Sequence, residues 1–200
     1  MNTRKLLMGI AGLISVALLW SCASTTKLTG AWKDPAYQGP AKKVVVAALA
    51  KQEAVRNFFE DEFVSQLKAR QVDAVASHTL VPFAQMGDRK AAVAKIKGTG
   101  ADIVIATRLV DRKTVETYMP GSPYPSHYYS WGDYYGYVYS PGYVAQDEYV
   151  YLESNVYQVA SEKLAWSARS ETWVVASSQE LIKSFVKVAV DKLAADKLIK

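Results

Sequence analysis

The feature that most constrains the fold is a continuous apolar run, KKVVVAALA at residues 42–50, followed directly by a long helical pattern. An apolar run without polar alternation is typical of a strand that is covered on both faces. Over residues 53–70, apolar side chains recur every fourth position, at Val55, Phe59, Phe63 and Leu67. This spacing predicts an amphipathic helix. A buried strand followed by a helix indicates a parallel crossover and therefore an α/β domain.

The rest of the chain continues this alternation of strands and helices. Residues 72–76 predict a second strand, and a second helix is expected from Asp88, its N-cap, to about Lys97. A third strand enters at residues 100–110 and continues loosely to residue 118, a length that suggests a bulge. The first half of the domain is therefore β-α-β-α-β.

A hairpin and a closing helix complete the domain. Strands are expected at about residues 148–159 and 163–175, joined by the turn ASEK. In the second of them the indole of Trp166 is predicted to face inward. Ser177 and Glu180 form a capping-box pattern that begins the last helix. The predicted fold class is α/β, a mixed sheet of about five strands with packed helices in the order β-α-β-α-β-β-β-α.

The amino terminus carries an export signal. Arg4 and Lys5 precede an apolar run that ends at LWSC, residues 19–22, so residues 1–21 are predicted to be a signal peptide. LWSC resembles the lipobox of bacterial lipoproteins, which implies lipidation of Cys22, the chain's only cysteine. The alternative is an ordinary secreted protein with a free thiol. Ala23 in place of Asp implies the periplasmic face of the outer membrane if the host is Gram-negative.

The remaining chain divides into a tether and one domain. Residues 22–41 are expected to form a lipidated tether rich in turn formers, and residues 42–200 a single domain. Without Arg4 and Lys5 the chain has 22 basic and 19 acidic residues, a net charge of +3. That mild, unclustered charge excludes nucleic acid as a partner.

Four segments carry a resemblance to a family of uncharacterised bacterial lipoproteins. They are WKDPAYQGPAKKVVVAAL, FFEDEFVSQLKARQVDAVAS, GADIVIATRLV and LESNVYQVASEKLAWSARSETW. More distantly, the strand order and the hairpin are similar to the TolB amino-terminal domain, the penicillin-binding-protein activators and the curli secretion lipoprotein. The resemblance implies a fold and an envelope location, and no activity.

The sequence carries no motif for an enzyme, a cofactor or a metal site. Neither His78 nor His127 has metal or catalytic spacing, and nucleophile-elbow, phosphate-loop and C-x-x-C patterns are absent from the sequence. We therefore predict a non-enzymatic protein with no catalytic, cofactor-binding or metal-binding residues.

Several carboxylates are candidates for a site. Glu60, Asp61 and Glu62 are expected on a solvated helix face, with Glu60 pairing Arg56 at i,i+4. Asp102 and Glu153 lie in or beside apolar strands and need partners, for which Arg108 and Arg169 are candidates. We interpret these as structural ion pairs.

The most unusual segment is a tyrosine-rich insertion at residues 119–147. Eleven of the thirteen tyrosines lie between Tyr118 and Tyr151, among prolines and glycines that argue against a continuous helix or central strand. Long loops are typically functional or disordered, and this one is too aromatic for an ordinary linker. The rings could pack on the domain's own sheet or contact a protein or glycan. A membrane hairpin and amyloid-like association are disfavoured by the prolines.

Tyrosine supplies a flat apolar face and a polar tip, which suits a binding surface. The predicted contact residues are Tyr124, Tyr128, Tyr129, Trp131, Tyr134, Tyr135, Tyr137, Tyr139 and Tyr143. The sequence thus favours a lipid-anchored binding or assembly module whose partners are the membrane and an envelope protein or peptidoglycan/glycan. The alternatives are an envelope enzyme, possibly a hydrolase, with a dispersed site, and an oligomeric secretion or assembly component.

Overall fold

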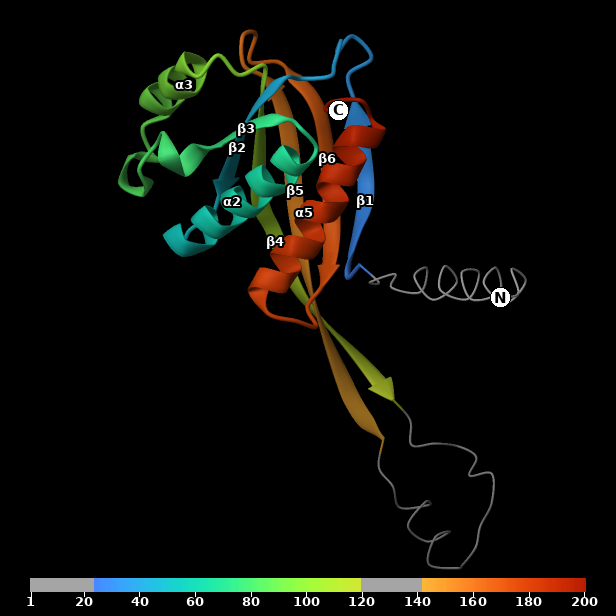
Figure 1. Ribbon diagram of the computed structural model, residues 1–200. Helices are drawn as coiled ribbons and strands as arrows, with labels where there is room; N and C mark the ends of the chain where they lie inside the picture. The colour runs from blue at the N-terminus through green and yellow to red at the C-terminus, as the bar shows by residue number, and fades with distance from the viewer. Residues whose placement is uncertain (1–23, 120–141) are drawn as a thin grey trace, which may run out of the picture.

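The computed structural model describes residues 24–119 and 142–200, and its elements are labelled in Figure 1. In chain order they are β1 Thr26–Lys33, β2 Lys43–Leu49, α2 Glu53–Ala69, β3 Asp73–Ala76, η1 Ser77–Thr79, η2 Phe83–Gln85, α3 Arg89–Gly98, β4 Ile103–Met119, β5 Tyr143–Gln158, β6 Leu164–Trp173 and α5 Ser178–Ala195. From β2 onward this order is the predicted one.

The strands form one mixed sheet in the order β1-β6-β5-β4-β2-β3. β2 is parallel to both β3 and β4, as the helical crossovers require, and the remaining pairs are antiparallel. A register irregularity between Leu109 and Asp111 is the bulge that the length of this strand predicted. The α/β fold class is confirmed, with six strands instead of about five.

The sixth strand lies in the segment that was predicted to be a tether. Residues 26–33 form β1, which pairs antiparallel with β6 along the edge of the sheet. The buried hydroxyls of Thr26 and Thr172 are hydrogen-bonded at 2.8 Å. Such polar pairs leave no apolar run for sequence reasoning to find. The tether prediction is therefore wrong for residues 26–33, and the domain includes this strand, which precedes the predicted start at residue 42.

The boundaries of the predicted insertion also change. β4 extends to Met119 and β5 begins at Tyr143, so residues 143–147 belong to a strand and not to the loop. The ladder between β4 and β5 runs without interruption from Asp111 to Met119, and it extends both strands. Residues 120–141 and 1–23 lie outside the described part of the chain.

The main core lies between the sheet and the two helices α2 and α5 (Figure 1). Phe59 packs against Phe63 and against Phe185 of α5, with ring centroids 5.9 and 5.6 Å apart. The side chain of Trp166 is 1% exposed, which confirms the predicted face of β6. Its indole Nε1 donates to Asp196 Oδ2 at 2.8 Å beyond the end of α5.

A smaller core covers only one end of the opposite sheet face. Val45, whose side chain points away from that of its neighbour Val44, packs with Ala101 and Val159 and with Leu80 and Ile96. Ile96 belongs to α3, which therefore covers the β2 end of this face. Within the described residues, no helix covers this face over β5, β6 and β1.

The helix ends follow the predicted capping. Asp88 caps α3 by accepting a hydrogen bond from Ala91 N at 3.0 Å. Ser177 and Glu180 form the predicted capping box at the start of α5. Within residues 24–119 and 142–200, the helices lack the length and apolar character that a bilayer crossing would need.

Candidate functional site

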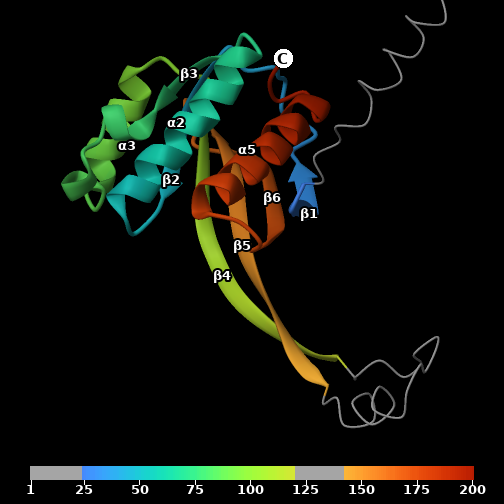
Figure 2. The same ribbon diagram turned by 60° about the horizontal axis from the view of Figure 1, so that its bottom comes forward.

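Strands β4 and β5 continue beyond the sheet as a two-stranded ribbon. β2 ends at Leu49, opposite Arg108, and β6 ends at Trp173, opposite Tyr149. Residues 114–119 and 143–148 therefore pair across the ribbon, over a length of about 20 Å. Figures 1 and 2 show this ribbon projecting away from the helices.

The end of the ribbon is an exposed apolar surface. Tyr118 is 65% exposed, Tyr143 66%, Val144 54% and Met119 42%. These four residues form two directly opposed pairs, Tyr118 with Val144 and Met119 with Tyr143. We call them the ribbon tip. Large exposed apolar groups that gather in one place, far from the core, are typical of interaction sites.

Gly142, the residue before β5, allows the backbone to pack closely against the ribbon tip. A Cβ at this position would overlap the phenol oxygen and ring carbon of Tyr118. The backbone of Gly142 therefore lies directly against the Tyr118 ring, and any larger residue would push the ring aside. This contact holds one of the exposed rings in place.

One of the nine predicted contact residues lies in the described structure. Tyr143 is exposed at the start of β5, in agreement with a contact role. The other eight, Tyr124, Tyr128, Tyr129, Trp131, Tyr134, Tyr135, Tyr137 and Tyr139, lie outside the described residues, and their roles stay predictions. Sequence reasoning missed Tyr118, Met119 and Val144. Their signal was the continued alternation of residues 111–118, which extends the strand to the tip.

The base of the ribbon is fixed on the open face of the sheet. Trp173 Nε1 donates to Asp147 Oδ1 at 3.0 Å, across the β5–β6 pair. Lys113 Nζ lies 5.5 Å from the centroid of the Tyr151 ring, within the range of a cation–π contact. These contacts join all three strands where the ribbon leaves the sheet.

An ionic group lies next to this base. A hydrogen bond from Lys27, 2.8 Å from the carboxylate, holds the pKa of Glu171 below its usual value. Partial burial and a hydrogen bond to Glu171 raise the pKa of Tyr151. The Tyr151 hydroxyl is therefore neutral and donating at neutral pH. The arrangement stabilises the junction of β1, β6 and β5 and offers no acid or base with a shifted pKa near neutrality.

The carboxylate cluster of α2 differs from its prediction. Glu60 does pair with Arg56, at 3.0 Å between Oε1 and Nε, but both side chains are buried, 0% and 1% exposed. The predicted solvated face is therefore wrong for this pair. The residues at positions 56, 60, 63 and 67 share one face of the helix, so the spacing to Phe63, i,i+3 from Glu60 and i,i+7 from Arg56, was the signal.

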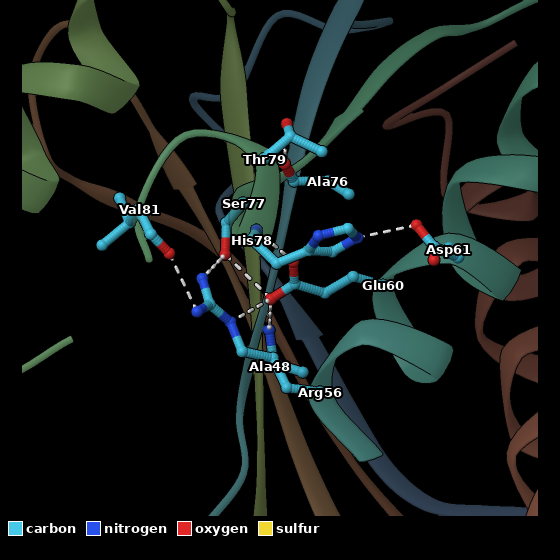
Figure 3. A network of polar contacts seen from close by, with 9 residues as sticks. All are labelled: Ala48, Arg56, Glu60, Asp61, Ala76, Ser77, His78, Thr79 and Val81. Atoms are coloured by element: carbon cyan, nitrogen blue, oxygen red, sulfur yellow. Dashed lines mark hydrogen bonds and ion pairs between the residues drawn. The ribbon is translucent and has the colours of Figure 1, made fainter. Parts of the chain in front are cut away.

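Figure 3 shows how the buried carboxylate is satisfied. Glu60 Oε1 accepts from Ala48 N at 2.9 Å and from the Ser77 hydroxyl at 2.8 Å, and Oε2 accepts from His78 N at 2.6 Å. The guanidinium of Arg56 also donates to Val81 O and to Ser77 Oγ, each at 2.9 Å. Because every charged atom has partners, this network joins α2 to β2 and η1 and leaves no free group for catalysis.

The remaining predicted polar residues have structural partners. Asp102 Oδ2 accepts from Lys42 N at 2.7 Å and from Lys43 N at 3.0 Å, where β2 begins. Glu153 pairs with Arg108, directly opposite on β4, which confirms the predicted structural ion pair. His78 lies in η1 with Nε2 2.7 Å from Asp61 Oδ1. Among the described residues, no three His, Cys, Asp or Glu side chains cluster as metal ligands would.

Comparison with known proteins gave similarity in fold alone. No protein-family model matches the chain, and no curated protein matches it. The PelC dodecamer from Paraburkholderia phytofirmans is 13% identical over 88% of this chain and 99% of its own, with a TM-score of 0.49. The lipoprotein GNA1162 from Neisseria meningitidis is 11% identical over 76% of this chain and 98% of its own, with a TM-score of 0.42. The solved structures to which this chain is similar thus include a lipoprotein, while the resemblance to the TolB domain stays a prediction.

Proposed function

We propose that this protein is an exported, lipid-anchored binding or assembly module of the bacterial envelope. It contacts a macromolecular partner, either an envelope protein or a peptidoglycan-type glycan, through the ribbon tip and the tyrosine-rich segment. The observation that carries the proposal is the exposed tip itself, where Tyr118, Met119, Tyr143 and Val144 lie at the end of a ribbon remote from the core. A core element would bury such side chains, whereas a contact element displays them.

The difference in burial between the two parts of β4 supports this role. Ile103 and Ile105 are fully buried and Thr107 is 4% exposed, but every residue from Arg108 to Met119 is exposed. The first third of the strand therefore stabilises the domain, and the rest contributes little to its core.

The export part of the proposal rests on the signal pattern of residues 1–21 and on LWSC. It is tested with Cys22→Ala. Loss of the lipid acceptor should move the protein from the membrane fraction to the soluble or unprocessed pool, because each buried acyl CH₂ contributes ~0.8 kcal/mol to partitioning. Processed protein that stays in the membrane fraction after this change would overturn the anchor.

The binding part is tested by crosslinked pull-down from intact envelopes with the full chain. Tyr118→Ser combined with Tyr143→Ser should reduce capture strongly, and replacing Tyr128, Tyr129, Tyr134 and Tyr135 with Ser should do the same. Val175→Ser is the matched control, since this residue is 52% exposed but lies beyond β6 and away from the tip. Equal capture by the wild type and both tyrosine variants would contradict the proposal. Unfolding of either variant, read by circular dichroism, would identify the rings as packed groups.

A further inference from the structure

Among the residues that the structure describes, the ribbon has one long strand edge without a partner strand. β4 pairs with β2 as far as Arg108, and from Leu109 to Met119 its outer edge has no strand beside it in the described part of the chain. Such an edge presents a row of backbone N–H and C=O groups to solvent and is a template for another strand.

The other edges in the described structure are shorter or irregular. β3 has four residues, and β1 is interrupted by an irregularity between Leu28 and Gly30. The edge of β5 is free only over residues 143–147, because Val174 N donates to Glu148 O at 2.8 Å. The outer edge of β4 is therefore the most favourable one for pairing with a further strand.

This edge is exposed and little protected. Its apolar side chains Leu109, Val110, Val115, Tyr118 and Met119 are between 40% and 65% exposed. A lysine often shields an edge strand, but Lys113 is held over the sheet by Asp111, at 3.6 Å, and by the ring of Tyr151. The ladder is also regular from Asp111 to Met119, so no bulge turns this stretch away.

We propose that the free edge of β4 binds the same edge of a second copy, antiparallel and about a two-fold axis at Thr114. In this register Arg112 lies opposite Glu116 of the second copy, and the pair occurs twice by symmetry. Opposite charges and paired threonines are both favourable directly across an antiparallel ladder.

The ends of the edge match in the same register. Leu109 and Val110, which flank the irregularity before Asp111, lie near Met119 and Tyr118 of the second copy, so apolar residues gather at both ends. The length matches as well. The next position inward, Arg108, is the one that pairs with Leu49 of β2. A second strand that ends opposite Leu109 therefore fills the free edge without displacing β2.

Neighbouring registers do not give this match. With the two-fold axis perpendicular to the sheet, each side chain stays on its own face of the sheet only if the strand register shifts by two residues. Moving the axis to Lys113 places two lysines opposite each other, and moving it to Val115 places Arg112 opposite Tyr118. The charge pattern therefore selects the register centred on Thr114. The interface goes beyond the proposed partner binding, since it uses the backbone edge of residues 109–119 and binds a second copy of this chain.

Exchanging the charges of Arg112 and Glu116 tests the register. The full chain is studied in mild detergent, and its mass is measured by light scattering. The wild type should give twice the chain mass as concentration rises. Arg112→Glu and Glu116→Arg should each raise the dimer dissociation constant about tenfold, because each places like charges opposite one another twice. The double variant restores opposite charges and should recover dimerisation.

The matched control removes the contact that Arg112 makes within its own chain. Arg112 Nη1 lies 2.6 Å from Glu148 Oε1, so Arg112→Glu also disrupts this pair. Glu148→Gln loses the same pair but leaves the proposed interface intact, and it should dimerise like the wild type. If Glu148→Gln is monomeric and the double variant does not recover dimerisation, the effect comes from the stability of the ribbon itself. That result would overturn the proposal.

Oxidative crosslinking reads the axis position independently. Opposed residues in an antiparallel ladder have Cα atoms about 4.5–5.5 Å apart, which suits a disulfide. Thr114→Cys should therefore give a covalent dimer on a non-reducing gel, whereas Thr117→Cys, about 20 Å from its symmetry mate, should not. The wild-type chain with Cys22 is the background control.

Three results would overturn the proposal: a monomer at all concentrations, equal crosslinking at positions 114 and 117, or a ring of more than two chains. Capture of a different protein along residues 109–119, with no dimer, would also do so. A failure here leaves the pull-down result of the variant at Tyr128, Tyr129, Tyr134 and Tyr135 unchanged, because these four positions lie outside residues 109–119. Tyr118 belongs to both proposals, so this four-residue variant separates them.

Discussion

Trp166→Ala tests the packing of the main core. The side chain is 1% exposed between the sheet and α5, and an aromatic residue of this size buries about 150–250 Å². At about 25 cal/mol per Å² the transfer free energy is roughly 4–6 kcal/mol, an upper value because the unfolded chain already buries some area. Partial collapse of the cavity brings the expected loss in free energy of unfolding to about 3–5 kcal/mol.

Two variants separate the contributions to this loss. Trp166→Phe keeps an aromatic ring but removes the indole N–H that donates to Asp196, so it should cost about 1–3 kcal/mol. Trp173→Ala is the matched control on the same strand, because its side chain is 44% exposed on the opposite face, and it should cost about 1 kcal/mol or less.

Urea unfolding of the chain from Ser24 onward gives all three values with a common slope. That start keeps the hydroxyl pair between Thr26 and Thr172. A loss below about 1 kcal/mol for Trp166→Ala, or a larger loss for Trp173→Ala, would refute the assignment of the faces of β6.

Three further predictions use the same titration. Arg56→Ala leaves the buried Glu60 carboxylate without its counter-charge and should cost about 3–5 kcal/mol; a loss below about 1 kcal/mol would contradict the ion pair's role. Ser177→Ala removes the N-cap of α5 and should cost about 1 kcal/mol; an unchanged urea midpoint would argue against the cap. Burial by itself raises the pKa of Asp196, but hydrogen bonds from Lys192 and Trp166 hold it below the ordinary 3.8. Stability from this group is therefore present above that value and lost as pH falls through the depressed pKa, and Asp196→Asn should flatten the acid dependence.

Much of the fold could be predicted from the sequence because the buried elements carry strong periodic patterns. The apolar run of β2, the repeating positions of α2 and the capping box of α5 each follow a local rule, and the structure obeys these rules except at Val55 of α2. β1 could not be found this way. Its inward residues include Thr26, which is buried only because Thr172 supplies a hydroxyl partner from a strand distant in sequence.

The candidate sites were harder to predict for the same reason. Burial of Glu60 depends on donors from Ala48, Ser77 and His78, which lie on β2 and η1 and are brought to α2 only by the fold. Val55, predicted on the inward stripe, is 38% exposed, and the stripe turns toward Arg56 instead. A charged residue in a helix is assigned to the surface by pattern alone, and tertiary hydrogen bonds reverse that assignment.

The ribbon connects stability to the proposed interactions. A two-stranded hairpin in water is marginally stable by itself, and the order of this one depends on its base, where Trp173 bonds Asp147 and Lys113 covers Tyr151. Lys113 lies six residues before the tip at Met119, and Asp147 lies opposite Val115. Nearer the tip, the described strands are joined by the backbone ladder and by a hydrogen bond from Gln146 Nε2 to Glu116 Oε1 at 2.8 Å. Pairing of two β4 edges would place the outer six positions in a four-stranded sheet, above the number of strands that is stable independently. The symmetric interface would thus add support to the outer ribbon and hold Tyr118 and Tyr143 of the two copies at opposite ends of one sheet.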